Sequence, residues 1–507
     1  MTIPLYNSNL YQAIRQLLLL LSILCLFAAA GCRDRHSFED TMLTDTSSFF
    51  YFNPALYPDN LSELPIGVFD SGTGGLAVLD DIVNYQCIET NEPVFGNEYF
   101  IYLADMANMP YGSYAMENNV GLLQEHIMKN VQFLTGNKYY DAAGSSRYLE
   151  DKRQVKAVVI ACNTATAYGK DKIEDFLAKT VPDIILVGVI DAATTAAINS
   201  FYEDESGTIA VLATDGTVRS EAYVHSLMDK NTELGRTGDI SIFQQAGVGI
   251  AEAIDDSRDF IDRTALVVRE NYRGPSEQEE GDMFINPAVF NRYMFDLDNG
   301  ALLFEGNIEH PFNIQINSIE NYVAFHLVSL MEKIKDAGNV PPLKTIILGC
   351  THYPYVDDVI SDVLGLLRNY SEDGEYIYRQ YMADEISLIN PGVKVARQLY
   401  ELMQKKNITG NNNPAESEFY IAVPNILNRN VQLREDGAFT YEYKYGRQPG
   451  EIQEYVKRIP FNREAIPDDI LLRLNQQIPR IYELMTIFNH DNPKTVYLPE
   501  GSRISAQ

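Results

Sequence analysis

The feature that most constrains this chain is a pair of matching apolar segments, each followed by a cysteine. One reads KAVVIACNTA at residues 156–165, and the other reads KTIILGCTHYP at residues 344–354. In each, a lysine precedes a short run of mostly β-branched residues, and a small residue and a cysteine follow it. Such runs are typical of buried strands in a parallel sheet. The repetition predicts an α/β protein with two similar domains, each with a parallel sheet and a cysteine where a strand ends.

These two cysteines, Cys162 and Cys350, have three interpretations. A free cysteine is often a small buried apolar residue, and this is the simplest reading of either one alone. A disulfide between them is less favoured, because only 5 cysteines occur in 507 residues. A chemical role is favoured because both are followed by hydroxyl, amide or imidazole groups. Ligands of parallel sheets bind at the carboxyl ends of strands, where helix N-termini stabilise thiolates.

A third segment, PIGVFDSGTGGL at residues 65–76, predicts a strand that ends at Asp70 and Ser71 before a glycine-rich turn. Glycines allow backbone N–H groups to face a ligand, and a following helix N-terminus attracts anions. The turn fits neither the dinucleotide-binding pattern nor the P-loop. It therefore indicates a site for a carboxylate or another small anion, with Asp70 as a buried acid/base candidate.

Four segments in this order resemble glutamate racemases of the aspartate/glutamate racemase superfamily: IGVFDSGTGGL, PYG at 110–112, ACNTATA and LGCTHYP. LATDGTVRSEAY at 212–223 and GVID at 188–191 add weaker matches. The resemblance covers roughly residues 65–255 and 320–405. It implies a pseudo-symmetric fold with the active site between two α/β domains. The first comprises residues 65–195 with a return segment of about 389–490, and the second comprises residues 196–388.

The resemblance implies racemisation of L-glutamate to D-glutamate without a cofactor, linked to peptidoglycan or D-amino-acid metabolism. Inversion at Cα requires a base on one face and an acid on the other, and the family uses two thiols. Cys162 would pair with Asp70 and Cys350 with His352, although a lone histidine in this position is often structural. Substrate binding is carried over to Asp70, Ser71, Tyr111, Gly112, Asn163, Thr164, Thr214, Thr217, Thr351 and His352.

Composition restricts the partners. Lysine and arginine number 40 against 70 aspartates and glutamates, a formal net charge of −30, which argues against nucleic acid. An anionic substrate then needs a locally positive site, made by backbone amides and helix ends. No spacing of cysteines and histidines suggests a metal site. We expect a small amino acid as the partner, and the sequence leaves a homodimer open.

The N-terminal segment RQLLLLLSILCLFAAAGC, residues 15–32, resembles a bacterial lipoprotein signal. Its apolar run is shorter than the 20 or so residues of a spanning helix. We expect residues 1–31 to be a signal peptide, Cys32 to be lipidated and residues 32–64 to be a tether. The protein would then be membrane-anchored and face the periplasm or cell surface. An uncleaved anchor is one alternative, and a cytoplasmic protein is expected if the leader is not used.

Several segments depart from the family pattern. Residues 256–318 form an insertion with a predicted hairpin turn at Asp298–Gly300, and residues 491–507 form a tail. The segment DDILLRLNQQIPRIYELM predicts helix interrupted at Pro479. Asp191 stands where glutamate is common, and INPG at 389–392 replaces the usual IDSG. The substrate could therefore be aspartate or another amino acid. A lipoprotein that binds an amino acid without turnover is the other alternative, and two thiols favour catalysis.

Overall fold

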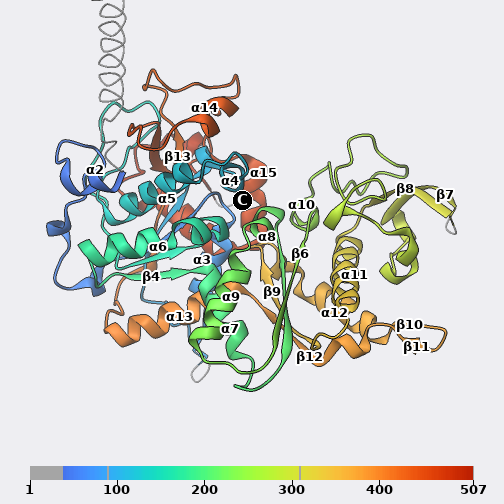
Figure 1. The fold of residues 1–507 in the computed structure, drawn as a ribbon. Helices are drawn as coiled ribbons and strands as arrows, with labels where there is room; N and C mark the ends of the chain where they lie inside the picture. The colour runs from blue at the N-terminus through green and yellow to red at the C-terminus, as the bar shows by residue number, and fades with distance from the viewer. Residues whose placement is uncertain (1–37, 88–90, 308–309, 506–507) are drawn as a thin grey trace, which may run out of the picture.

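The computed structural model of the protein describes residues 38–87, 91–307 and 310–505. Within these ranges the chain forms two α/β domains, each built on a sheet of mainly parallel strands (Figure 1). The predicted fold class is therefore confirmed. The segments predicted as strands before Asp70, Cys162 and Cys350 are all strands.

The first sheet has six strands and includes both early and late parts of the chain. In spatial order they are β14 (Val456–Pro460), β13 (Glu418–Pro424), β2 (Phe100–Ala104), β1 (Ile66–Asp70), β3 (Ala157–Ile160) and β4 (Ile185–Gly188). All neighbours are parallel except β13 and β14. Because β1 pairs directly with β3, with Phe69 opposite Ile160, Asp70 and Cys162 emerge side by side at the carboxyl edge.

The second sheet has four parallel strands. In spatial order they are β12 (Met382–Ile389), β9 (Leu343–Gly349), β5 (Gly207–Ala213) and β6 (Ile240–Ala246). Ala213 lies opposite Gly349 in the register of β5 and β9. The segments that begin at Thr214 and Cys350 therefore leave the sheet next to each other.

Helices cover both faces of the first sheet, as expected for parallel strands that are buried on both sides. One face packs against α5 (Val120–Thr135) and α6 (Asn163–Thr180). The other packs against α3 (Gly75–Asn84), α7 (Val189–Asn199) and α13 (Pro391–Lys406), and this core continues into β5 of the second sheet. The far face of the second sheet packs against α10 (Ile250–Ile254), α11 (Ile319–Ala337) and α12 (Asp357–Asn369).

Residues 38–64, part of the expected tether, are packed against the first domain. They include α2 (Phe38–Thr44), and Phe38, Met42, Phe50 and Phe52 are buried in the core formed with α5 and α6. Burying four large apolar side chains stabilises this arrangement, since each contributes about 1.5–3 kcal/mol. The described part of this segment is therefore not a free linker.

The C-terminal segment adds β13 and β14 to the first sheet and also forms three α-helices, one between these strands and two after β14. These are α14 (Tyr441–Gly446), α15 (Asp468–Gln477) and α16 (Pro479–Asp491). Pro479 occupies the first turn of α16, where its missing N–H costs nothing. The predicted interruption of the helix at this residue is confirmed.

The insertion contains an antiparallel hairpin of β7 (Leu302–Asn307) and β8 (His310–Ile316). The predicted position of the hairpin turn was wrong. Asp298–Gly300 forms a 3-10 turn before β7, with Asn299 at a φ of 54°. Asn and Gly readily adopt a positive φ, so this sequence forms a tight turn. Here the turn leads into the hairpin and does not connect its two strands.

No helix in residues 38–87, 91–307 or 310–505 is long and apolar enough to cross a membrane. The signal-like segment and Cys32 lie outside the described residues.

Candidate active site

The first cysteine lies against the glycine-rich turn. Cys162 precedes α6, and its sulfur accepts a hydrogen bond from the Ala165 N–H at 3.5 Å and lies 3.7 Å from the Ser71 hydroxyl. Asp70 Oδ2 accepts from the Gly75 N–H at 2.8 Å, at the start of α3. Cys162 and Asp70 are each only 7% exposed. The pairing predicted from the sequence is therefore possible in this geometry.

Burial controls the protonation of this pair. Burial, with the Asp70 charge added to it, raises the pKa of Cys162 to about 12. Burial also raises the pKa of Asp70, although hydrogen bonds from Gly75, Ser71 and the Cys162 thiol oppose the shift. Cys162 is thus a neutral thiol at pH 7, and the buried carboxyl beside it can accept the thiol proton.

The second cysteine has a basic partner. His352 Nδ1 lies 3.8 Å from the Cys350 sulfur, and His352 Nε2 lies 3.3 Å from Asp255 Oδ1. Burial disfavours the charged imidazole, but the interactions with Asp255 and Cys350 outweigh it and raise the pKa of His352 to about 10. The imidazole is therefore a cation at neutral pH, next to the Cys350 sulfur.

Side-chain contacts connect the two cysteine segments across the domain boundary. Asn163, directly after Cys162, donates from Nδ2 to the carbonyl of Gly349 at 3.0 Å, directly before Cys350. The Tyr223 hydroxyl fixes this amide by donating to its Oδ1 at 2.9 Å. The structure thus brings together the ends of β3 and β9.

Thr351 reaches the glycine-rich turn of the first domain. A Cβ added to Gly74 would stand 3.0 Å from the Thr351 hydroxyl and 3.6 Å from Asp70 Oδ2. This position is therefore tight for any larger residue. The close approach places Thr351 beside Asp70, as expected for residues of one site.

The remaining predicted binders lie at helix starts. Thr214 and Thr217 are hydrogen-bonded to each other at 3.0 Å at the start of α8 (Asp215–Arg219). Gly112 begins α4 (Gly112–Met116) and lies against Gly216 of that segment. Thr164 lies in the first turn of α6.

Tyr111 is arranged differently from the other predicted binders. Its hydroxyl donates to Asp105 at 2.6 Å and accepts from Asn130 at 2.8 Å, and the side chain is buried. Its side chain therefore belongs to an internal polar network.

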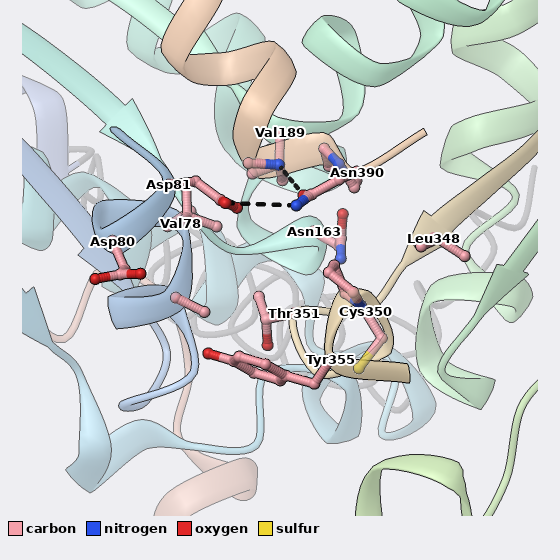
Figure 2. Close-up of a pocket in the computed structure, with 15 residues that line it drawn as sticks. Val78, Asp80, Asp81, Asn163, Val189, Leu348, Cys350, Thr351, Tyr355 and Asn390 are labelled. Carbon is pink, nitrogen blue, oxygen red and sulfur yellow. Dashed lines mark hydrogen bonds between the residues drawn. The ribbon is translucent and has the colours of Figure 1, made fainter. Parts of the chain in front are cut away.

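A cavity of about 60 Å³ lies between the two domains next to Cys350 and Thr351 (Figure 2). Its other wall includes Asp81 of α3, which points toward Asn390 and accepts from its amide at 3.4 Å. Burial raises the pKa of Asp81 to about 7 and that of Asp80 to about 6. A cavity of this size holds a few waters, and neither Cys162 nor Asp70 lines it.

Sequence reasoning missed two residues near the second cysteine, Asp255 and Arg473. Asp255 lies at the end of the range that the resemblance covers but in none of the matching segments, and Arg473 lies in a C-terminal helix outside that range. Only the fold brings them to His352. Within the described ranges, no group of three or more histidine, cysteine, aspartate or glutamate side chains could hold a metal ion.

Comparisons with known proteins identify similar sequences. The chain is 26% identical over 358 residues to the glutamate racemase of Pseudomonas syringae pv. tomato, a match that covers 71% of this chain and 85% of that protein. It is 26% identical over 364 residues to that of Ectopseudomonas mendocina, covering 71% and 90%. No protein-family model matches the sequence.

Solved structures were compared in the same way. Glutamate racemase from Bacillus anthracis aligns with a TM-score of 0.41 and 21% identity, covering 71% of this chain and 88% of that one. Glutamate racemase from Francisella tularensis, in complex with D-glutamate, aligns with a TM-score of 0.40 and 20% identity, covering 76% and 95%.

Proposed function

We propose that this protein is an amino-acid racemase that interconverts L- and D-glutamate with its own side chains as acid and base. The similarity to glutamate racemases supports an amino-acid racemase. The observation that carries the mechanism is the pair of buried strand-end cysteines, one beside a carboxyl group and the other beside an imidazolium. A protein that only binds an amino acid has no need of two such thiols.

In one direction the Cys350 thiolate, next to the His352 cation, removes the α-proton. The electron pair of the broken C–H bond remains on the substrate and is delocalised into its carboxylate. The Cys162 thiol then gives its proton to the opposite face of Cα, and the new C–H bond completes the inversion. In the other direction the same steps run in reverse: the Cys162 thiolate that the first direction leaves beside Asp70 removes the α-proton, and the Cys350 thiol gives its proton to the opposite face.

The carbanion needs stabilisation in a protein with a large negative charge. The helices α3, α6 and α8 follow the ends of β1, β3 and β5, so their N-termini lie at the sheet edges where the two cysteine segments begin. Backbone N–H groups at helix N-termini stabilise the charge that develops on a substrate carboxylate. The Thr351 hydroxyl, near Asp70, is a further donor for the same group.

The test is proton exchange at Cα. Purified residues 33–507, in deuterated water and without added pyridoxal phosphate, should replace the α-proton of both L- and D-glutamate, as followed by proton NMR. Aspartate, measured in parallel, decides the substrate. A folded, reduced sample that binds glutamate but exchanges neither enantiomer of either amino acid would support a binding lipoprotein instead.

We also propose that the enzyme is exported and anchored through Cys32, on the evidence of the lipobox-like AAGC sequence. Several acyl chains, each worth about 0.8 kcal/mol per buried methylene, would hold it at the membrane. Expressed in a bacterium, the mature protein should begin at an acylated Cys32, and a Cys32→Ser variant should lose both the acyl label and the cleavage. Intact Met1 without a label would instead indicate an anchor helix, or a cytoplasmic enzyme if the protein is in the cytosol.

A further inference from the structure

The C-terminal segment brings an arginine to the histidine that partners Cys350. Arg473 lies on α15, in the C-terminal segment. Its Nη1 is 2.7 Å from Asp255 Oδ2, while the other oxygen of Asp255 is 3.3 Å from His352 Nε2. His352 in turn lies 3.8 Å from the Cys350 sulfur. One carboxylate thus connects an arginine of the C-terminal segment to the second thiol.

The arginine fixes the orientation of this carboxylate. Asp255 follows the last residue of α10, a five-residue helix, and its side chain is 27% exposed. With His352 as its only partner, the carboxylate could rotate toward water. Arg473 occupies the second oxygen and leaves the first one directed at the imidazole. A guanidinium suits this task because its donors are planar and rigid.

The position of Arg473 is itself well defined. Its neighbours on α15, Leu471 and Leu474, are buried in the core that also contains α3 and α16. Arg473 and Leu474 line a cavity of about 20 Å³ together with Thr73, Gly74, Thr351 and His352. The helix therefore closes the site on the side of the second cysteine.

We propose that Arg473 is a positioning residue for acid–base catalysis at Cys350, acting through Asp255 and His352. The C-terminal segment thus completes one of the two catalytic faces and leaves the Cys162 face unaffected. This inference rests on the proposed racemase function. Arg473 reaches the reacting atoms only through other side chains, so it contributes to kcat and not to substrate affinity.

Kinetics of Arg473→Met and Arg473→Lys test the inference. Arg480→Met is the matched control, because it removes an exposed cation of the same segment that pairs only with Glu483. We expect Arg473→Met to lower kcat about tenfold, a part of the effect typical of general acid–base groups, with KM nearly unchanged. Arg473→Lys should keep most of the wild-type kcat.

Isotope effects with α-deuterated substrates separate positioning from a general structural defect. In Arg473→Met the primary effect on kcat/KM should rise for the enantiomer that Cys350 deprotonates and fall for the other. In an Asp255→Asn background, Arg473→Met should have no further effect. Equal changes for both enantiomers, additive losses, or a raised KM with unchanged kcat would overturn the inference.

Titration of the His352 imidazole by NMR gives a readout that does not need activity. The charged or titratable groups around His352 are Cys350, Tyr355, Asp255 and Arg473, with Asp70 across the glycine-rich turn. Losing a nearby cation would raise the pKa of His352, but losing a correctly placed Asp255 would lower it. We expect Arg473→Met to lower the pKa of His352, and a rise would contradict the inference.

The failure of the proposed function and the failure of this inference can be told apart. If wild-type protein shows no α-proton exchange, the proposed function fails, while the titration still decides the role of Arg473.

Discussion

The two cysteines end equivalent strands of two similar domains, yet their surroundings differ in charge. Cys162 lies beside a buried carboxyl group, and its own pKa is raised to about 12. Cys350 lies beside an imidazolium, which is held by a carboxylate and, through it, by a guanidinium. Asp80 and Asp81, on the helix that follows Asp70, have raised pKa values and line a cavity together with Cys350 and Thr351.

This difference matches what a two-base reaction needs. If both thiols had the same surroundings, both would tend to be protonated or both ionised at a given pH. Here one thiol lies beside a carboxyl group and the other beside a cation, so the two cysteines have different electrostatic surroundings. The similar folds of the two domains place the two sulfurs, and the neighbouring side chains make their surroundings different.

The largest effect should come from removing either sulfur. Cys162→Ser and Cys350→Ser should each lower racemisation by at least about 10³-fold, because each direction needs both an acid and a base. Each variant should retain slow α-proton exchange with one enantiomer only, and the preferred enantiomer should differ between them. Circular dichroism follows racemisation, and proton NMR in deuterated water follows exchange.

Cys87→Ser is the control for these variants, since Cys87 lies at the end of the α3 segment and outside the predicted site. It should keep wild-type activity. If both site variants kept equal exchange with both enantiomers, the assignment of one thiol to each face would be wrong.

The second-largest effect should come from removing the side chains next to the two thiols, Asp70 and His352. Asp70→Asn and His352→Asn should each reduce kcat by about 10²-fold, within the range of general acid–base contributions. The primary deuterium isotope effects should shift in opposite senses for the two enantiomers, because each variant slows a different proton transfer. Identical isotope patterns in the two variants would mean that the two sides are not chemically distinct.

The third effect concerns pH. Because His352 has a raised pKa of about 10, wild-type activity should fall roughly tenfold per pH unit above that value, and His352→Asn should lack this step. The stability of the folded protein should change with pH in the same direction, because it also depends on the charged imidazole. The contribution of the charged imidazole is fully present below its ordinary pKa of about 6.5 and is lost as pH rises through about 10. The difference in melting temperature between wild type and His352→Asn should therefore shrink between these values.

The smallest effect concerns the two buried carboxyl groups of α3. Asp81 has a pKa raised to about 7, so its ionisation in the folded state costs stability as pH rises from about 4 to 7. Asp81→Asn should therefore raise Tm by a few degrees at pH 8 and leave it unchanged below pH 4. Asp80→Asn should do less, because its pKa is raised only to about 6.

The exposed Asp183→Asn, which removes a carboxylate beside Lys406, is the control for this measurement. It should not change Tm at either pH. A destabilised Asp81→Asn at pH 8 would mean that the ionised carboxylate is favourable in the folded protein, contrary to the raised pKa of Asp81.

Local sequence patterns were sufficient for one part of this site. Short apolar runs that end in a small residue predict buried parallel strands, so Asp70, Cys162 and Cys350 could be assigned to strand ends directly. Asp255 and Arg473 could not, because their roles depend on contacts between segments about 100 or more residues apart in the chain. Asp105 and Asn130, which hold Tyr111 in its internal orientation, lie only 6 and 19 residues away in the chain, but no local pattern specifies that the tyrosine hydroxyl points inward.

The central strand β2 has its second neighbour, β13, some 300 residues later in the chain. At typical rates of protein synthesis, this separation lasts on the order of tens of seconds. During that time the all-buried sequence FIYLA of β2 has an unpaired edge of the kind that recruits other chains into aggregates. A nascent chain that stops before β13 would therefore need chaperones to remain soluble, and biosynthesis of this protein depends on how quickly its last hundred residues arrive.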